Sequence, residues 1–259
     1  MTKSLSFLIV LLSSGIVIII PLQIIAQTIP IHPAPSSSEN SSNSIDFEKL
    51  ATQITVKVIA GKTWGSGIII NREGSVYTVL TNRHVLTPSE HHQIQAPDGQ
   101  IYRASQILDI PFHGNDLALL QFRALNTITY QVAQLGNSSS LNPGDRIFAS
   151  GFPFNTENLS LNPHGLTLTS GRIALILDQP LREGYQLGYT NDIRKGMSGG
   201  PVFHCDGKVI GVNGMHAYPL WGDPYSYQDG SQPNLEEKRQ MRHYSWAILM
   251  DTFTQYPAY

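Results

Sequence analysis

The sequence predicts an all-β protein built from antiparallel strands. Short segments rich in Val, Ile, Thr and aromatic residues alternate with turn-forming residues from residue 54 to residue 249. Between them lies no run of about 10 to 15 residues with helical periodicity, which the crossovers of a parallel sheet would require. The chain of 259 residues also holds 22 glycines and 16 prolines, which suit many tight turns between short strands.

The strand pattern recurs in both halves of the chain. In the first half it covers residues 54–59, 67–70, 76–81, 93–95, 101–108 and 117–122. In the second half it covers residues 146–150, 166–177, 186–190, 201–204, 208–212 and 244–249. One helical turn is expected at residues 46–51, before the first strand. Residues 219–240, which are rich in Tyr, Gly, Asp and Pro and include Trp221, are expected to form a long loop.

The N-terminal segment, residues 1–26, has the pattern of a secretory signal peptide. Lys3 is followed by an apolar stretch over residues 5–20, and residues 24–26 (IIA) form an acceptable cleavage site. An uncleaved membrane anchor is the alternative, because the segment carries no charge after Lys3 and nearly reaches the length of a membrane span. In both cases the remainder of the chain is expected outside the cytoplasm, either secreted or periplasmic.

The amino-acid composition limits the kinds of partner that the part of the chain after the leader is expected to bind. Residues 27–45, rich in Pro, Ser and Asn, have no apolar face and are expected to be a disordered linker. The formal net charge of −2 argues against nucleic acid or an anionic membrane surface as a partner, apart from the possible N-terminal anchor. Cys205 is the only cysteine, which excludes an intrachain disulfide, and it is expected to be buried on a strand.

No residue pattern indicates a cofactor or a metal site. His91 and His92 are adjacent, so on a strand their side chains would point to opposite faces and would not readily share a metal ion. The sequence gives no indication of the oligomeric state.

The segment with the clearest chemistry is residues 195–202 (KGMSGGPV). It places Ser198 in a glycine-rich turn that leads into an apolar strand. Glycine on both sides lets the backbone approach a substrate closely and lets N–H groups converge on one point. A hydroxyl nucleophile beside such donors can attack a carbonyl and stabilise the oxyanion that forms.

Two upstream segments supply partners for this serine. Residues 81–86 (TNRHVL) follow a β-rich run and carry His84, and residues 114–120 (GNDLALL) carry Asp116. Histidine, aspartate and serine therefore follow one another along the chain, each at the end of an apolar segment. Asp109 is an alternative acid because it also follows a strand.

Together these segments resemble the trypsin-like serine peptidases of the chymotrypsin fold, in particular the bacterial HtrA-type and glutamyl-endopeptidase-type enzymes. No part of the chain resembles the PDZ module that HtrA-type enzymes append. The resemblance extends over residues 54–249 and includes weaker matches at residues 65–70, 135–138, 143–146, 151–153, 170–173 and 208–212. It implies two packed six-stranded antiparallel β-barrels, over residues 46–128 and 129–259, with the active site in the cleft between them.

The resemblance also implies the role of each residue. Ser198 would attack the peptide carbonyl, His84 would act as the base, and Asp116 would orient and stabilise the imidazole. The backbone N–H groups of Gly196 and Ser198 would form the oxyanion hole. The expected activity is that of a serine endopeptidase that cleaves polypeptides in extended conformation through an acyl-enzyme, without a cofactor.

Three residues are expected near the substrate side chain. Asp192 lies six residues before Ser198, where trypsin itself carries an acidic residue that binds basic side chains. The alternative is that Asp192 faces solvent or pairs with Arg194 or Lys195. By the same resemblance, Asn213 and His216 lie on the segment that would border the pocket and pair with the substrate backbone.

Two other functions remain open at this point. A catalytically silent, protease-like domain could use the same cleft to bind peptides. An esterase could use the same residues, but residues 196–200 (GMSGG) lack the one-residue spacer after serine that the Gly-x-Ser-x-Gly elbow requires.

Overall fold

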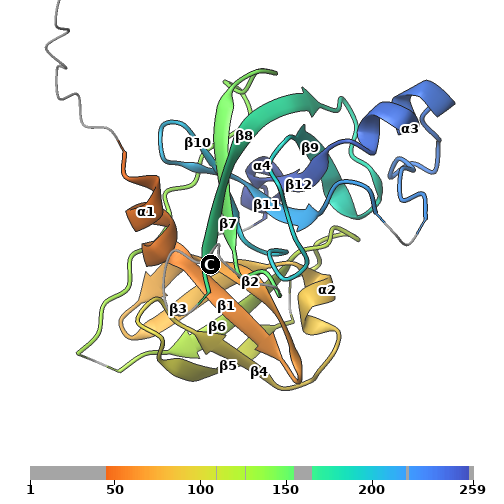
Figure 1. The fold of residues 1–259 in the computed structure, drawn as a ribbon. Coiled ribbons are helices and arrows are strands. Elements are labelled where there is room, and N and C mark those ends of the chain that lie inside the picture. Colours follow the sequence, from red (N-terminus) through yellow and green to blue (C-terminus); the bar gives the residue numbers. More distant parts are fainter. Residues whose placement is uncertain (1–44, 109, 126, 155–164, 220–221, 257–259) are drawn as a thin grey trace, which may run out of the picture. The chain divides into compact units, whose positions relative to one another are not determined.

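Twelve strands form two closed antiparallel barrels of six strands each in the part of the chain that the structure describes (Figure 1). The structure is a computed structural model, and it describes residues 45–108, 110–125, 127–154, 165–219 and 222–256. The leader, and the linker up to residue 44, lie outside these residues. All twelve expected strands are present, and the predicted all-β, two-barrel class is confirmed.

The first barrel uses the six strands of the first half. These are β1 (Thr55–Ala60), β2 (Thr63–Glu73), β3 (Val76–Thr81), β4 (His92–Gln95), β5 (Ile101–Ile107) and β6 (Ala118–Arg123). The spatial order is β1-β2-β3-β6-β5-β4, and pairing of β4 with β1 closes the barrel. Pairing of β3 with β6 positions the candidate site, because the two segments that carry His84 and Asp116 adjoin this pair.

The second barrel repeats this arrangement with the later strands. These are β7 (Arg146–Gly151), β8 (Thr167–Ile176), β9 (Tyr185–Tyr189), β10 (Pro201–His204), β11 (Val209–Met215) and β12 (Ser245–Leu249). The order is β10-β11-β12-β9-β8-β7, and β7 pairs with β10 to close it. The loop that carries Ser198 connects β9 to β10.

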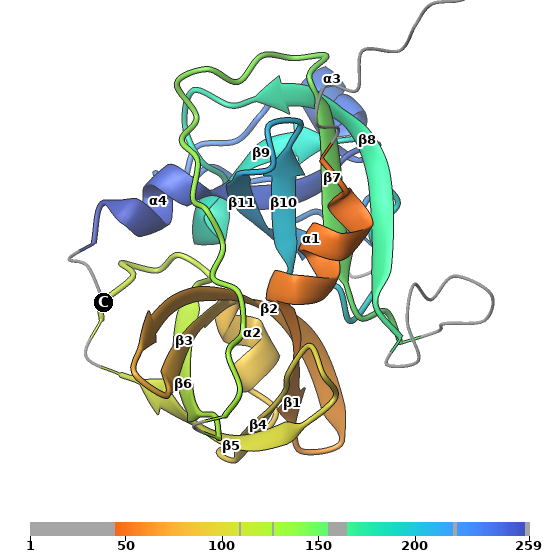
Figure 2. The same cartoon turned by 90° about the vertical axis from the view of Figure 1, so that its left-hand side faces the viewer.

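Helices are short and lie between or beside the barrels. They are α1 (Phe47–Ile54), α2 (Arg83–Leu86), α3 (Leu235–Met241), α4 (Met250–Thr254) and the 3-10 turn η1 (Arg182–Gly184). The expected turn before β1 is thus a helix of eight residues, capped by the side chain of Asp46. Figure 2 shows α1 beside the second barrel, where Phe47 stacks on Phe148 at 3.9 Å between ring centroids, before the chain enters β1.

The loop expected over residues 219–240 is only partly irregular. Helix α3 begins inside it, because Asn234 and Glu237 form a reciprocal capping box with each other's backbone N–H groups. Trp221 lies outside the described residues. The expectation of one long loop was therefore wrong for its last part, where α3 begins. The Asn234 and Glu237 pair in the sequence would have indicated the start of this helix.

The barrels pack together through apolar and hydroxyl side chains. A core cluster shared by both barrels includes Leu80 and Leu119 from the first and Phe203 and Trp246 from the second. At the same boundary, Thr55 Oγ1 lies 2.7 Å from Ser150 Oγ, with both side chains buried. This packing fixes helix α2, which carries His84, and the loops that carry Asp116 and Ser198 with respect to one another.

The single cysteine is not in the core. Cys205 is exposed in the turn after β10, because that strand ends at His204. The expectation that it is a buried strand residue was wrong.

None of the described helices combines the length and the apolar character that crossing a membrane requires.

Candidate active site

His84 is placed by the end of a strand and the start of a helix. β3 ends at Thr81, Asn82 is the N-cap residue of α2, and His84 lies in the first turn of that helix. The Asn82 side chain donates from Nδ2 to the carbonyl oxygen of Asp116 at 2.8 Å. This bond joins the start of α2 to the loop before β6, so the two chain segments hold a fixed spacing.

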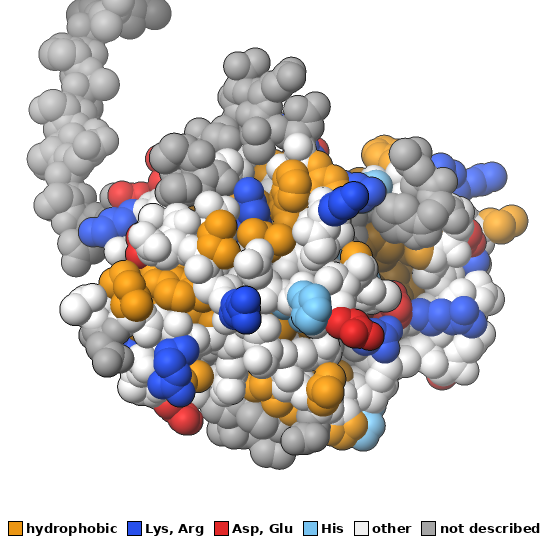
Figure 3. All heavy atoms as spheres, turned by 90° about the horizontal axis from the view of Figure 1, so that it is seen from below, with side chains coloured by type: hydrophobic (Ala, Val, Ile, Leu, Met, Phe, Trp, Pro, Cys, Tyr) orange, Lys and Arg blue, Asp and Glu red, His pale blue; other side chains and the backbone are white. Residues whose placement is uncertain are grey.

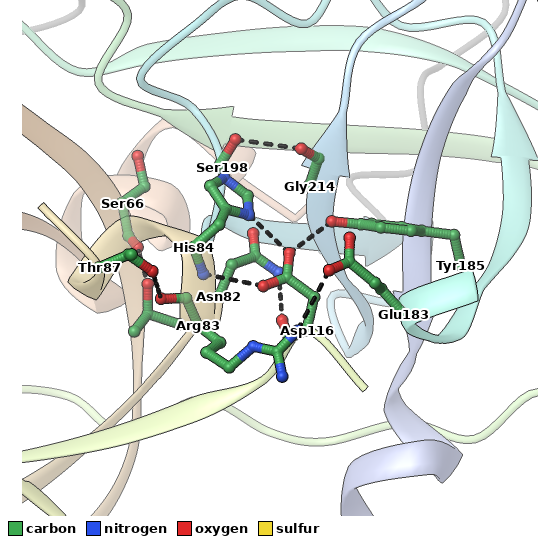
Figure 4. Close-up of polar contacts among 11 residues, drawn as sticks. Ser66, Asn82, Arg83, His84, Thr87, Asp116, Glu183, Tyr185, Ser198 and Gly214 are labelled. Carbon is green, nitrogen blue, oxygen red and sulfur yellow. Dashed lines mark hydrogen bonds and ion pairs between the residues drawn. The ribbon is translucent and has the colours of Figure 1, made fainter. Parts of the chain in front are cut away.

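The carboxylate of Asp116 makes two hydrogen bonds with His84 (Figure 4). The backbone N–H of His84 donates to Oδ1 at 2.9 Å, and the ring Nδ1 donates to Oδ2 at 2.5 Å. Asp116 is fully buried, whereas the His84 side chain is 48% exposed. A carboxylate on Nδ1 keeps the proton of neutral imidazole on that nitrogen, which leaves Nε2 free to accept a proton.

The same carboxylate makes His84 more basic. Burial opposes protonation of the ring, but the hydrogen bond and the negative charge of Asp116 outweigh it, and Glu183 adds to them. The pKa of His84 is therefore raised above its ordinary value of 6.5. An imidazole with a raised pKa is a stronger base once it is neutral.

Hydrolysis is expected to depend on pH through this group. If neutral His84 is the base, kcat/KM rises with pH and levels off above the pKa of the free enzyme. Since Asp116 raises that pKa, the midpoint should lie above 6.5. A pH profile of kcat/KM on a peptide substrate without titratable groups measures the midpoint. A profile that is flat between about pH 5 and 8, across the range in which histidine titrates, would contradict the assignment of His84.

Ser198 lies in a turn whose backbone requires glycine at the next position, Gly199. Gly199 has φ +86°, and a Cβ there would lie 2.1 Å from the backbone oxygen of Ser66 on β2. The Ser66 N–H donates to the Ser198 carbonyl at 2.7 Å, which fastens the turn to the first barrel. The Ser198 hydroxyl donates to the Gly214 carbonyl at 3.1 Å, and Figure 4 shows the serine beside the His84 ring.

The peptide groups just before Ser198 are held by the first barrel and by the segment that follows β7. The Ser66 hydroxyl donates to the Gly196 carbonyl at 2.9 Å, and the Phe154 N–H donates to the Lys195 carbonyl at 2.9 Å. Among the described residues, neither the Gly196 N–H nor the Ser198 N–H has a hydrogen-bond acceptor. Two free amide donors two residues apart in a rigid turn are the arrangement that an oxyanion hole requires.

Asn213 supports this turn from behind. It is fully buried, and its Nδ2 donates to the carbonyl oxygen of Met197 at 2.9 Å. The Tyr189 hydroxyl donates to Asn213 Oδ1 and fixes the orientation of the amide. The structure therefore places Asn213 under the serine loop, where its side chain is occupied, rather than at the surface of a pocket.

The other two expected pocket residues lie elsewhere. Asp192 has an exposed carboxylate that accepts a hydrogen bond from Arg194 Nη2 at 2.7 Å, which matches the interpretation in which it pairs with a neighbour. His216 follows β11 and is half-buried, and its Nδ1 donates to the Ala217 carbonyl at 2.7 Å.

Neither histidine of the adjacent pair is brought to the site. Asp109 lies outside the described residues. His92 is buried, with its Nε2 donating to the Leu86 carbonyl at 3.1 Å, whereas His91 is exposed. Within the described ranges, no three His, Cys, Asp or Glu side chains are grouped so that they could hold a metal ion.

Sequence reasoning missed the residues that support the site. Asn82 and Ser66 lie within segments that the motifs included, but their bonds to Asp116 and Gly196 join positions 34 and 130 residues apart. Tyr185 begins β9, and its hydroxyl donates to Asp116 Oδ2 at 2.6 Å. No local pattern distinguishes this tyrosine from any other strand residue.

Comparisons with known proteins agree with this geometry. The model of the family described as trypsin-like peptidase domain matches residues 65–212. The chain is 35% identical over 159 residues to "Serine protease HTRA1" of Xenopus tropicalis, an alignment that covers 58% of this chain and 30% of that protein. It is 32% identical over 151 residues to "Probable periplasmic serine endoprotease DegP-like" of Marinomonas sp., covering 58% of this chain and 29% of that protein.

Solved structures share the fold. A structure titled "HtrA-type protease AlgW with tripeptide" has a TM-score of 0.59 at 23% identity and covers 80% of this chain and 60% of its own. A structure of a variant of the same protein, also with tripeptide, has a TM-score of 0.60 at 22% identity with the same coverage. The matched region thus spans about a third of the HtrA-named relatives and over half of the solved chains.

Proposed function

The chain belongs to the trypsin-like peptidase family, and we propose that it is an exported serine endopeptidase that hydrolyses peptide bonds through His84, Asp116 and Ser198. The observation that carries this proposal is the buried Asp116 carboxylate. It accepts from both the backbone and the ring of His84, beside a rigid turn that presents Ser198.

The chemistry follows from these contacts. The Ser198 hydroxyl turns from the Gly214 carbonyl toward Nε2 of His84 and transfers its proton there as its oxygen bonds to the scissile carbonyl carbon. His84 then protonates the leaving amine, and the C–N bond breaks to give an acyl-enzyme. A water molecule then gives a proton to His84 as its oxygen bonds to the ester carbonyl carbon. His84 returns that proton to the Ser198 oxygen as the ester C–O bond breaks and the acid product leaves. Asp116 stabilises the imidazolium in both halves.

The oxyanion would be bound by the amides of Gly196 and Ser198. Neither has an acceptor among the described residues, and the peptide groups of the turn are held by Ser66 and Phe154. Donors that are already oriented need no reorganisation when the charge develops, and in enzymes of this kind the removal of one such donor raises the barrier by about 2.7–4 kcal/mol.

We propose polypeptide in extended conformation as the substrate. Support comes from the tripeptide named in the titles of the two similar structures. The formal net charge of −2 offers no argument for nucleic acid, and on the face drawn in Figure 3 the described Lys and Arg side chains are scattered, some of them beside acidic side chains, rather than gathered in one basic patch.

A preference for basic side chains through Asp192 is not expected. The carboxylate is 66% exposed and paired with Arg194, so it is screened by water and by its partner. Asp192→Asn should change relative kcat/KM for peptides with Arg, Leu or Glu before the scissile bond by less than about twofold. Profiling both proteins on one peptide library tests this. A wild-type preference for Arg that disappears in the variant would contradict it.

A catalytically silent peptide-binding domain is the competing function, and covalent labelling separates the two. A serine-directed phosphonate should modify wild-type protein at Ser198, located by mass spectrometry of the digested adduct. His84→Ala should label far more slowly, because the hydroxyl loses its base. Protein that binds an unfolded polypeptide but neither cleaves it nor reacts with the phosphonate would support the silent domain instead.

We also propose that residues 1–26 direct export and that residues 27–45 link the leader to the peptidase domain over residues 46–259. The name of the similar Marinomonas protein describes it as a periplasmic endoprotease, which agrees with a secreted or periplasmic location. N-terminal sequencing of the exported protein should give Gln27. An intact Met1 would leave the anchor interpretation instead.

A further inference from the structure

We propose that Tyr185 is a positioning residue that holds the Asp116 carboxylate in the orientation His84 requires, an inference that rests on the proposed function. Its hydroxyl donates to Asp116 Oδ2 at 2.6 Å, the same oxygen that accepts from His84 Nδ1 at 2.5 Å. Tyr185 is 5% exposed and Asp116 is fully buried, so water does not compete freely for this bond.

The hydrogen bond from Tyr185 to Asp116 connects the two barrels. Tyr185 begins β9 of the second barrel, where it pairs with Ile248, whereas Asp116 belongs to the loop before β6 of the first. Figure 4 shows the tyrosine reaching the carboxylate from the side opposite α2. The acid is therefore fully oriented only when the two barrels are packed together.

A glycine makes room for this hydroxyl. A Cβ at Gly214 would lie 2.5 Å from the Tyr185 hydroxyl oxygen and 2.6 Å from Cε1, closer than such atoms pack. Gly214 is also the residue whose carbonyl accepts from Ser198. The absence of a side chain at this position thus gives Tyr185 its access to Asp116.

Tyr185 stays a donor throughout the working range of pH. Burial raises the pKa of its hydroxyl well above the ordinary value, and the negative charges of Asp116 and Glu183 raise it further. A neutral phenol beside a buried carboxylate can only donate, so the bond keeps one direction. Asp116 then has three donors: the His84 backbone on Oδ1, and His84 Nδ1 and Tyr185 on Oδ2.

This arrangement has two consequences. A buried carboxylate with fixed donors on both oxygens cannot rotate away from the imidazole. The bond from Tyr185 also withdraws negative charge from Oδ2 and moderates the basicity that Asp116 gives to His84. The remaining charged groups near His84 are Glu183, which raises its pKa, and Arg83, which lowers it.

Tyr185→Phe removes the hydroxyl and keeps the ring. We expect kcat to fall about tenfold with little change in KM, because a charged hydrogen bond that orients the acid is lost. We also expect the pKa of His84, followed by NMR titration, to rise, because Oδ2 loses a donor. Gly214→Ala displaces the same hydroxyl from the other side and should raise that pKa too.

Tyr130→Phe is the matched control, since Tyr130 donates to the carboxylate of Asp98 at 2.9 Å and has no contact with the site. It should lose a bond of the same kind without altering the His84 titration. An unshifted pKa of His84 in whichever of the two test variants folds would overturn the proposal, even if kcat fell. The NMR titration of His84 does not require turnover. If the wild type hydrolyses no peptide, the proposed function is refuted, but the titration of the variants still tests the role of Tyr185.

Discussion

Replacing Ser198 with alanine is expected to lower kcat for peptide hydrolysis by about 10⁶-fold and to leave the fold intact. The substitution removes the only atom that can form the acyl-enzyme. His84, Asp116 and the two free amides stay in place, but they have no nucleophile to assist. The lost side chain makes one hydrogen bond, to the Gly214 carbonyl at 3.1 Å, so the free energy of unfolding should change by about 1 kcal/mol or less.

Steady-state cleavage of a fluorogenic peptide, together with thermal unfolding, measures both effects. Ser140→Ala is a suitable control, because Ser140 is exposed in the connection between the barrels and lies outside the site. The control should retain wild-type kcat. If Ser198→Ala hydrolysed peptides within about tenfold of the wild type, the nucleophile would have to be another group.

Asp116→Asn is expected to lower kcat at neutral pH by about 10⁴-fold. The backbone N–H of His84 needs an acceptor at the position of Oδ1, so the amide oxygen of asparagine must take that place. Its NH₂ group then faces Nδ1 of the ring, which must become the acceptor and leave the proton on Nε2. An imidazole in this tautomer cannot take the proton of Ser198.

The same variant should change the pH profile. The substitution removes the hydrogen bond from the ring to the carboxylate and the negative charge of Asp116, which together raise the pKa of His84, so the midpoint of kcat/KM should move to lower pH. Asp109→Asn is the informative comparison, since Asp109 was the alternative acid in the sequence. Near wild-type hydrolysis by Asp116→Asn, with activity lost in Asp109→Asn, would reverse the assignment.

The strands were predictable because their signal is local. Apolar runs such as Val76–Thr81 and Ser245–Leu249 lie between turn residues, and each became a strand in the expected place. β2 was predicted too short at residues 67–70, because Gly65 lowers the strand propensity before this stretch and residues 71–73 (NRE), which follow it, are polar. The structure explains the glycines of β2 by close packing, since a Cβ at Gly67 would lie 2.5 Å from the side chain of Val79.

The sequence indicated the site residues that lie next to turns, but it did not indicate the residues that hold them in place. His84 and Ser198 stand beside recognisable turns, so their neighbours pointed to them. Asn213 was expected in a segment that borders the pocket, after a strand predicted to end at residue 212. The structure extends β11 to Met215 and directs the buried amide of Asn213 to the carbonyl of Met197. Tyr185 meets Asp116 only because two barrels pack, and such contacts between distant residues leave no trace in a single sequence.

The central claim is that an imidazole oriented by Asp116 makes the hydroxyl of Ser198 a nucleophile. Trapping the acyl-enzyme tests it most directly. An activated ester of a short peptide is mixed with the protein, the reaction is quenched in acid within milliseconds, and the masses of the intact protein and of its proteolytic fragments are measured. We predict one acyl group on Ser198 of the wild type and none on Ser198→Ala. Turnover without any acylated Ser198, or an acyl group on another residue, would contradict the account.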